Sequence, residues 1–231
     1  EAVLCLTEVA PGQRLILSAT GPLNRDYDDV RAFADAAKQG ISQAKSAGAR
    51  SPLLLVLAPQ SPVYQQAKAV AYLGACQALW QPLEGREALG ETKVEPVQQV
   101  GVVGISDADA DYLNAVEAGK RLARDLCGTE PERMAPRRFA DYCTEAFAGT
   151  PVSVSVERDV MKLNQDYPLL MAVARCSLQV ERHKPAVIRL EYQGDGPVEQ
   201  TLLFAGKGLV YDTGGADLKT GGAMAGMSRD K

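Results

Sequence analysis

The feature that most constrains the fold is an alternation of strand-like and helix-like segments along roughly the first hundred residues. Short apolar runs bounded by turn residues predict strands; these runs lie at 2–9, 14–19, 53–58 and 98–103. Apolar residues at three- and four-residue steps predict helices over 28–47 and from Pro62 towards Trp80. This order is typical of an α/β domain with a partly parallel sheet. Because the 53–58 run is continuously apolar, we expect both of its faces to be covered.

A long helix separates this region from a second α/β segment. Ser106 and Asp109 form a capping-box-like pair, and an apolar stripe continues towards Gly128. Beyond it we expect a helix that starts at Pro136, followed by strands at 152–156, 186–192 and 200–211. We therefore predict three parts: an N-terminal α/β domain with a mixed sheet, a connecting helix and a second α/β segment. Their ranges are 1–105, 106–128 and 129–231.

Composition excludes several classes of protein. Lys plus Arg number 25 against 29 Asp plus Glu, a net charge of −4, which argues against a nucleic-acid partner. No apolar run approaches the ~20 residues that a membrane-spanning helix needs, so we expect no membrane partner. The cysteines form no C-x-x-C pair and are interpreted as reduced, mostly buried thiols of a cytosol-like compartment; they are Cys5, Cys76, Cys127, Cys143 and Cys176.

The densest group of chemically active residues lies in 206–231. Lys207 follows an apolar run, where burying its charge is costly without a partner. Asp212 precedes two glycines, which allow a sharp turn and a close approach of the backbone to a ligand. The two side chains reach one site only if the chain bends, and Gly208 lies at that place. A metal ion would bind both a carboxylate and a deprotonated amine. The alternative is a glycine-rich loop with a Lys–Asp ion pair.

The spacing of these residues resembles the leucine aminopeptidases, two-metal exopeptidases also called cytosol aminopeptidases. Their pattern is G-K-G-x-x-[FY]-D-[ST]-G-G, then a lysine, then an aspartate. Here Gly206-Lys207-Gly208 leads to Asp212, Lys219 follows seven residues later, and Asp230 follows eleven residues after that. Upstream, 122–126 and 134–139 match the helix and turn that open the family's catalytic domain. The resemblance covers 113–231 well and the N-terminal domain by architecture only.

The resemblance implies a role for each matched residue. Lys207 and Asp230 would bind the more loosely held metal, and Asp212 would bridge both metals. Lys219 would polarise the substrate and stabilise the charged intermediate. The implied cofactors are two divalent ions, Zn²⁺, Mn²⁺ or Mg²⁺, and the implied substrates are peptides that lose their N-terminal amino acid. The family also implies a homo-hexamer in the cytoplasm, with 129–231 as an incomplete metallopeptidase catalytic domain.

Part of the family's site is absent from this sequence. The N-T-D-A-E-G-R motif, which supplies two further carboxylate ligands and an arginine, does not follow Asp230 within these residues. The segment Glu84-Gly85-Arg86 lacks the preceding Asp-Ala and precedes Lys207, so it is rejected as coincidence. We therefore expect the chain to carry about half of a dinuclear site and to need a downstream segment, in the same or a cleaved chain. The alternative is a non-catalytic pseudoenzyme or structural subunit with this fold.

Two other candidates are weaker. His183 lies in a polar stretch beside Lys184 and Pro185, and we expect it to be exposed to solvent because no partner with metal-ligand spacing accompanies it. Cys143 is rejected as a nucleophile because no histidine is placed to activate it.

Overall fold

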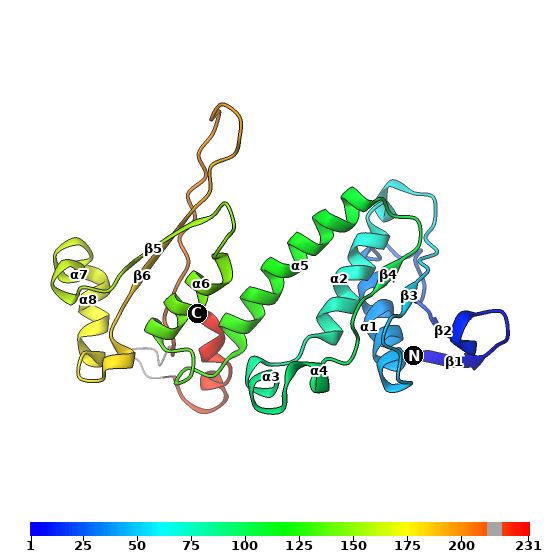
Figure 1. Ribbon diagram of the computed structural model, residues 1–231, viewed down its shortest axis with the longest axis horizontal. Coiled ribbons are helices and arrows are strands. Elements are labelled where there is room, and N and C mark those ends of the chain that lie inside the picture. Colours follow the sequence, from blue (N-terminus) through cyan, green and yellow to red (C-terminus); the bar gives the residue numbers. More distant parts are fainter. Residues whose placement is uncertain (212–218) are drawn as a thin grey trace. The chain divides into compact units, whose positions relative to one another are not determined.

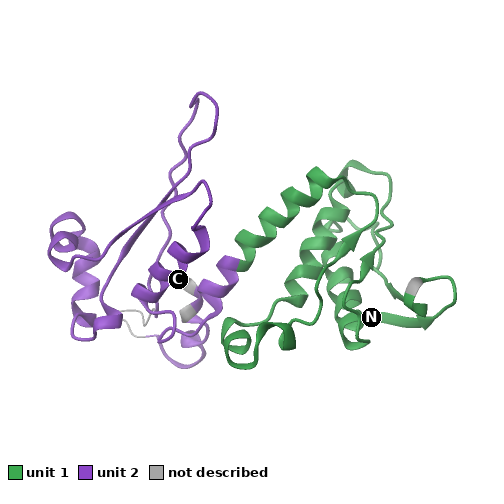
Figure 2. Ribbon diagram, viewed as in Figure 1, with its two compact units in different colours: residues 1–121 green, residues 122–231 purple. Residues whose placement is uncertain are grey.

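A computed structural model describes residues 1–211 and 219–231, with only the backbone described at residues 11, 228 and 230 (Figure 1). The chain forms two compact units, Glu1–Arg121 and Leu122–Lys231 (Figure 2). Helix α5, Asp107–Gly128, contributes residues to both units. In the described residues, the strands pair as three two-stranded sheets. The helices of the described part are all too short or too polar to span a bilayer.

The first unit opens with an antiparallel hairpin, as the sequence predicts. Strands β1 (Ala2–Leu6) and β2 (Arg14–Ser18) place Leu4 opposite Ile16. A single 3-10 turn, η1 (Pro11–Gln13), lies in the connection, and Gly12 has a φ of 76°, a conformation that glycine adopts without steric cost. The hairpin is joined to the next helix because the Ser18 hydroxyl donates to the Ala36 carbonyl at 2.7 Å.

Helices α1 (Arg31–Ser46) and α2 (Ala67–Leu79) form the core of the first unit by packing against each other. The 3-10 turn η2 (Pro62–Tyr64) precedes α2. The Phe33 ring meets the Tyr64 ring edge-on, with 5.8 Å between ring centres. Small buried residues let the helices approach closely; the buried residues of this contact are Phe33, Tyr64, Ala67, Ala71, Ile41, Ala44 and Ala75.

The 53–58 segment differs from its prediction. Only β3 (Leu53–Leu54) is a regular strand, paired in parallel with β4 (Gly101–Val102). Leu54 and Val56 pack against the helical core, whereas alternate residues face outwards: Leu53 is 69% exposed, Leu55 67% and Leu57 80%. The prediction that both faces are covered is therefore wrong in the described structure, because α1 and α2 cover one face only.

A polar segment between α2 and β4 folds as two short helices, α3 (Leu83–Leu89) and α4 (Glu91–Val94). Arg121 of α5 holds this segment, since its guanidinium lies 2.6 Å from a Glu95 carboxylate oxygen and 2.9 Å from one of Glu91. The segment thus ends in an ion-pair network at α5.

The predicted capping box begins α5. The Ser106 hydroxyl accepts from the Asp109 amide at 3.1 Å, and the Ser106 amide donates to the Asp109 carboxylate at 3.4 Å. These reciprocal bonds satisfy donors that the first turn of a helix leaves without partners.

The second unit combines helices with one antiparallel strand pair. Helix α6 (Pro136–Phe147) precedes β5 (Ser153–Glu157), which pairs with β6 (Val187–Glu191) so that Ser155 lies opposite Arg189. Both strands lie where the sequence predicts them. The remaining elements are helices α7 (Val160–Asp166) and α8 (Pro168–Ala174) and the 3-10 turns η3 (Arg175–Ser177), η4 (Glu181–His183), η5 (Gly221–Met224) and η6 (Met227–Asp230).

A buried carboxylate connects α5 to α6. Asp125 is 2% exposed, and the Tyr142 hydroxyl donates to its Oδ2 at 2.9 Å. Thr129, also 2% exposed, donates its hydroxyl to the Asp125 carbonyl at 2.6 Å. Because a buried carboxyl group without hydrogen bonds is strongly destabilising, the Tyr142 bond fixes the end of α5 against α6, whereas the Thr129 bond closes the helix end itself.

The predicted strand at 200–211 is wrong for the described structure. Residues 201–209 have no regular secondary structure, and they lie in the extended segment that follows β6 (Figure 1). Leu202 is 65% exposed, and Leu203 and Phe204 are each 91% exposed. A strand needs a neighbour to pair its backbone groups, and the described residues supply none for this run. Its apolar composition alone therefore does not make it a strand.

We predict that Gly74→Ala destabilises the first unit. An added Cβ would lie 2.7 Å from both Cα and the carbonyl oxygen of Ala34 in α1. Because backbone cannot move aside cheaply, we expect a loss of about 1–3 kcal/mol in the free energy of unfolding, measured by urea denaturation. Gly119→Ala is the control, since it lies on α5 with no atom within 4 Å of the added Cβ. That variant should gain about 0.5–1 kcal/mol. Equal free energies of unfolding for the two variants would contradict the close approach of α1 and α2 at Gly74.

We predict that Tyr142→Phe destabilises the second unit by removing the hydroxyl that donates to Asp125. The cost should be about 1.5–3 kcal/mol, the range for hydrogen bonds to charged groups, seen in the same denaturation experiment. Tyr112→Phe is the control because Tyr112 is 68% exposed on α5. If the Tyr142→Phe variant is as stable as this control, the buried carboxylate does not need this donor.

Candidate metal and catalytic residues

The four residues predicted for the site lie in one segment, part of which is described. Lys207 is exposed in the irregular stretch before Tyr211, so its expected burial is not found. Asp212 lies outside the described residues. Lys219 is partly buried just before η5, and Asp230 is the last residue of η6, with its side chain outside the described part. The common site of these four residues therefore stays a prediction.

Lys219 is directed towards the turn that contains Asp230. Its Nζ lies 3.1 Å from the Met227 Sδ, and Met227 is the first residue of η6. A thioether sulfur is a weak acceptor, so this contact restrains the ammonium without neutralising its charge. The predicted catalytic lysine and the turn of a predicted metal ligand thus lie together.

Sequence reasoning did not identify Lys231, which follows Asp230. Its Nζ donates to the carbonyls of Thr129 at 2.6 Å and Cys127 at 3.4 Å, at the C-terminal end of α5. The acceptors are backbone groups far away along the chain, at separations of 102 and 104 residues. No motif spacing signals such a contact. The only cue was a charged residue beside a predicted ligand.

His183 is held in an ion-pair cluster. Its Nε2 lies 2.7 Å from Glu132 Oε2, and Arg182 contacts the other oxygen of that carboxylate. Hydrogen bonds from Arg182 and then from His183 keep the pKa of Glu132 below its usual value. The expected solvent exposure of His183 is found only in part, since its side chain is 33% exposed and the Glu132 carboxylate holds the ring.

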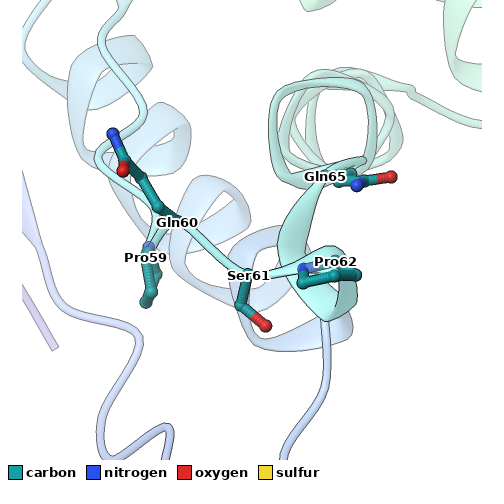
Figure 3. A pocket seen from close by; sticks show the side chains of 5 residues that line it. All are labelled: Pro59, Gln60, Ser61, Pro62 and Gln65. Carbon is teal, nitrogen blue, oxygen red and sulfur yellow. The ribbon is translucent and has the colours of Figure 1, made fainter.

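Three further features of the described residues bear on catalysis: metal-ligand clusters, the Cys143 thiol and a surface depression. No group of three or more His, Cys, Asp or Glu side chains that could hold a metal occurs among the described residues. Burial raises the pKa of the Cys143 thiol, which makes it a poor nucleophile. A shallow depression in the first unit has no ionisable group in its lining (Figure 3); the lining residues are Pro59, Gln60, Ser61, Pro62 and Gln65.

Comparison with known proteins agrees with the motif. Residues 121–231 match the sequence model of the cytosol aminopeptidase family, catalytic domain. The chain is 44% identical over 230 residues to the protein named "Putative aminopeptidase W07G4.4" of Caenorhabditis elegans, an alignment that covers 97% of this chain and 43% of that protein. The chain therefore spans less than half the length of this relative.

Solved structures share the fold. The bottromycin maturation enzyme BotP in complex with Mn superposes with a TM-score of 0.77 at 23% identity, over 99% of this chain and 46% of that one. The leucyl aminopeptidase from Trypanosoma cruzi gives a TM-score of 0.73 at 20% identity, over 99% and 44%. At sequence identities of 23% and 20%, the structural likeness establishes the fold of this chain. It is the sequence match of 121–231 to the family's catalytic domain, with the 44% identical relative, that places this chain in the cytosol aminopeptidase family.

Proposed function

We propose that the protein is a metal-dependent aminopeptidase that releases N-terminal amino acids from peptides by a two-metal hydrolytic mechanism. The observation that carries this proposal is the register of Lys207, Asp212, Lys219 and Asp230, which lie at the family's spacing inside the segment that its catalytic-domain model matches. A glycine-rich loop with a single ion pair would need only the first two of these residues. The cytoplasm and a homo-hexameric assembly belong to the same proposal and rest on family resemblance.

The donor chemistry fits divalent metal ions. One amine and two carboxylates suit Zn²⁺, Mn²⁺ or Mg²⁺, and the solved BotP structure is a complex with Mn. Lys207 would bind as a neutral amine, because a metal ion that takes the amine as a ligand displaces its proton. Three side chains are too few to hold two ions, so we propose that the rest of the relatives' length, which this chain does not cover, supplies the other ligands.

Lys219 is assigned an electrostatic role. When bound, the metal ions supply Lewis-acid polarisation of the peptide carbonyl and a water of lowered pKa. The Lys219 ammonium would stabilise the negative charge that develops on the carbonyl oxygen, as preorganised donors do in other hydrolases. Its contact with Met227 supports this role, because it limits the positions that the ammonium samples before substrate arrives.

We predict that Lys207→Met lowers the metal content of the purified full-length protein by one of its two ions. The variant keeps an unbranched side chain but loses the donor nitrogen. Asp212→Asn should lose more, because both ions share that carboxylate and its charge. Metal stoichiometry by mass spectrometry is the measurement, and Lys38→Met, in an exposed ion pair of α1, is the control. Full metal content in the Lys207→Met variant would remove Lys207 from the site.

We predict that Lys219→Ala keeps its metal but loses turnover of a leucyl amide. The fall in kcat should be about 10²–10³-fold, as for removal of one oxyanion donor. Lys162→Ala serves as the control, because that lysine forms an exposed ion pair with Glu157 in the second unit and should turn over normally. Undiminished turnover in the Lys219→Ala variant would refute the assignment. An inactive wild-type protein that binds metal would favour the non-catalytic alternative.

A further inference from the structure

The C-terminal end of α5 is a site that attracts a cation. The last carbonyls of a helix lack intrahelical donors, and the helix dipole places negative charge there. The Asp125 carbonyl accepts from the amide and the hydroxyl of Thr129, at 3.2 and 2.6 Å. The carbonyls of Cys127 and Thr129 accept from the Lys231 ammonium. The Lys231 ammonium is therefore a cation bound at the C-terminal end of α5.

The acceptors of Lys231 belong to a rigid part of the second unit. Thr129 is 2% exposed, Leu126 is 8% exposed, and the neighbouring Met134 and Ala135 are 1% and 2% exposed. The Asp125–Tyr142 hydrogen bond fixes the same helix end to α6. One of the two acceptors, Thr129, therefore lies among buried residues, where packing leaves little room for movement.

The segment that carries Lys231 is built from local contacts. Its 3-10 turns are closed by short-range bonds such as Ala223 amide to Thr220 carbonyl at 3.3 Å and Arg229 amide to Gly226 carbonyl at 3.0 Å. The Lys219–Met227 contact spans eight positions. In contrast, the bonds of Lys231 join this segment to α5. They connect the residue that follows Asp230 to the end of that helix.

We propose that Lys231 is a positioning residue that fixes Asp230 for metal binding, an inference that rests on the proposed function. Two carbonyls of α5 accept from the same ammonium, so the Lys231 side chain is held at a defined place on the helix end. Consecutive Cα atoms are about 3.8 Å apart, so an anchored Lys231 restricts the positions open to the Asp230 backbone. A ligand held in this way loses less conformational freedom when a metal ion binds.

Lys231→Met in the full-length protein tests the inference. Met has a similar unbranched length but neither charge nor donor. We expect 10- to 100-fold weaker binding of Mn²⁺, the usual effect of losing a group that orients a ligand, measured by equilibrium dialysis. We also expect faster amide hydrogen exchange over 220–231 in the metal-free protein. Lys231→Arg keeps donors for the carbonyls and should recover most of both properties. Lys38→Met should change neither.

The possible failures are distinguishable. If the wild-type protein binds Mn²⁺ and the Lys231→Met variant binds it equally well, the positioning role is wrong while the proposed function stands. If Lys231→Arg impairs binding as much as Lys231→Met does, donation to the carbonyls is not what matters and the inference also fails. A wild-type protein that binds no Mn²⁺, Zn²⁺ or Mg²⁺ overturns the proposed function together with the inference. Should Lys231→Met not fold, Lys231→Arg still tests the inference, because loss of Mn²⁺ affinity and of exchange protection in that variant refutes the role.

Discussion

The buried carboxylate of Asp125 determines how the second unit is arranged. A carboxyl group with 2% exposure is tolerated only when hydrogen bonds replace its water, and Tyr142 of α6 provides one. The same turn of α5 then presents Cys127 and Thr129 carbonyls to Lys231. The neighbouring helices α5 and α6 and the distant segment at Lys231 thus meet at one helix end. The first unit depends on a different constraint, the close approach of α1 and α2 at Gly74, where a side chain would clash with Ala34.

Local signals in the sequence predicted local structure well. The Ser106–Asp109 pair begins α5 as expected because both partners of a capping box lie within one turn. The alternation in β5 is confirmed, with Val154 and Val156 less exposed than Ser153 and Ser155. The prediction of a strand at 200–211 failed because a strand depends on a pairing partner as well as on its own composition. The apolar residues Leu203 and Phe204 do not reveal whether such a partner is present.

The candidate site likewise contains residues that the sequence could reveal and residues that it could not. Lys207, Asp212, Lys219 and Asp230 could be predicted because their spacing along one segment matches a family pattern, and spacing is visible in a sequence. Lys231 was not found, since its acceptors are backbone carbonyls, which every residue carries. The contact of Lys219 with Met227 could not be predicted either, because the sequence does not distinguish a methionine that contacts a lysine from one that only fills space. The residues that orient a site are therefore harder to predict than the residues proposed to perform its chemistry.

Positioning and metal binding would be coupled through the segment that ends at Lys231. This segment includes two short 3-10 turns, η5 and η6, and ordering each of its residues costs conformational entropy. Bonds from Lys231 to α5 offset part of that cost before a metal arrives, so less binding free energy is spent on ordering the ligand. By linkage, a metal that prefers the ordered segment also stabilises it. The helix end and the metal would therefore act on one equilibrium, the ordering of the turn that carries Asp230.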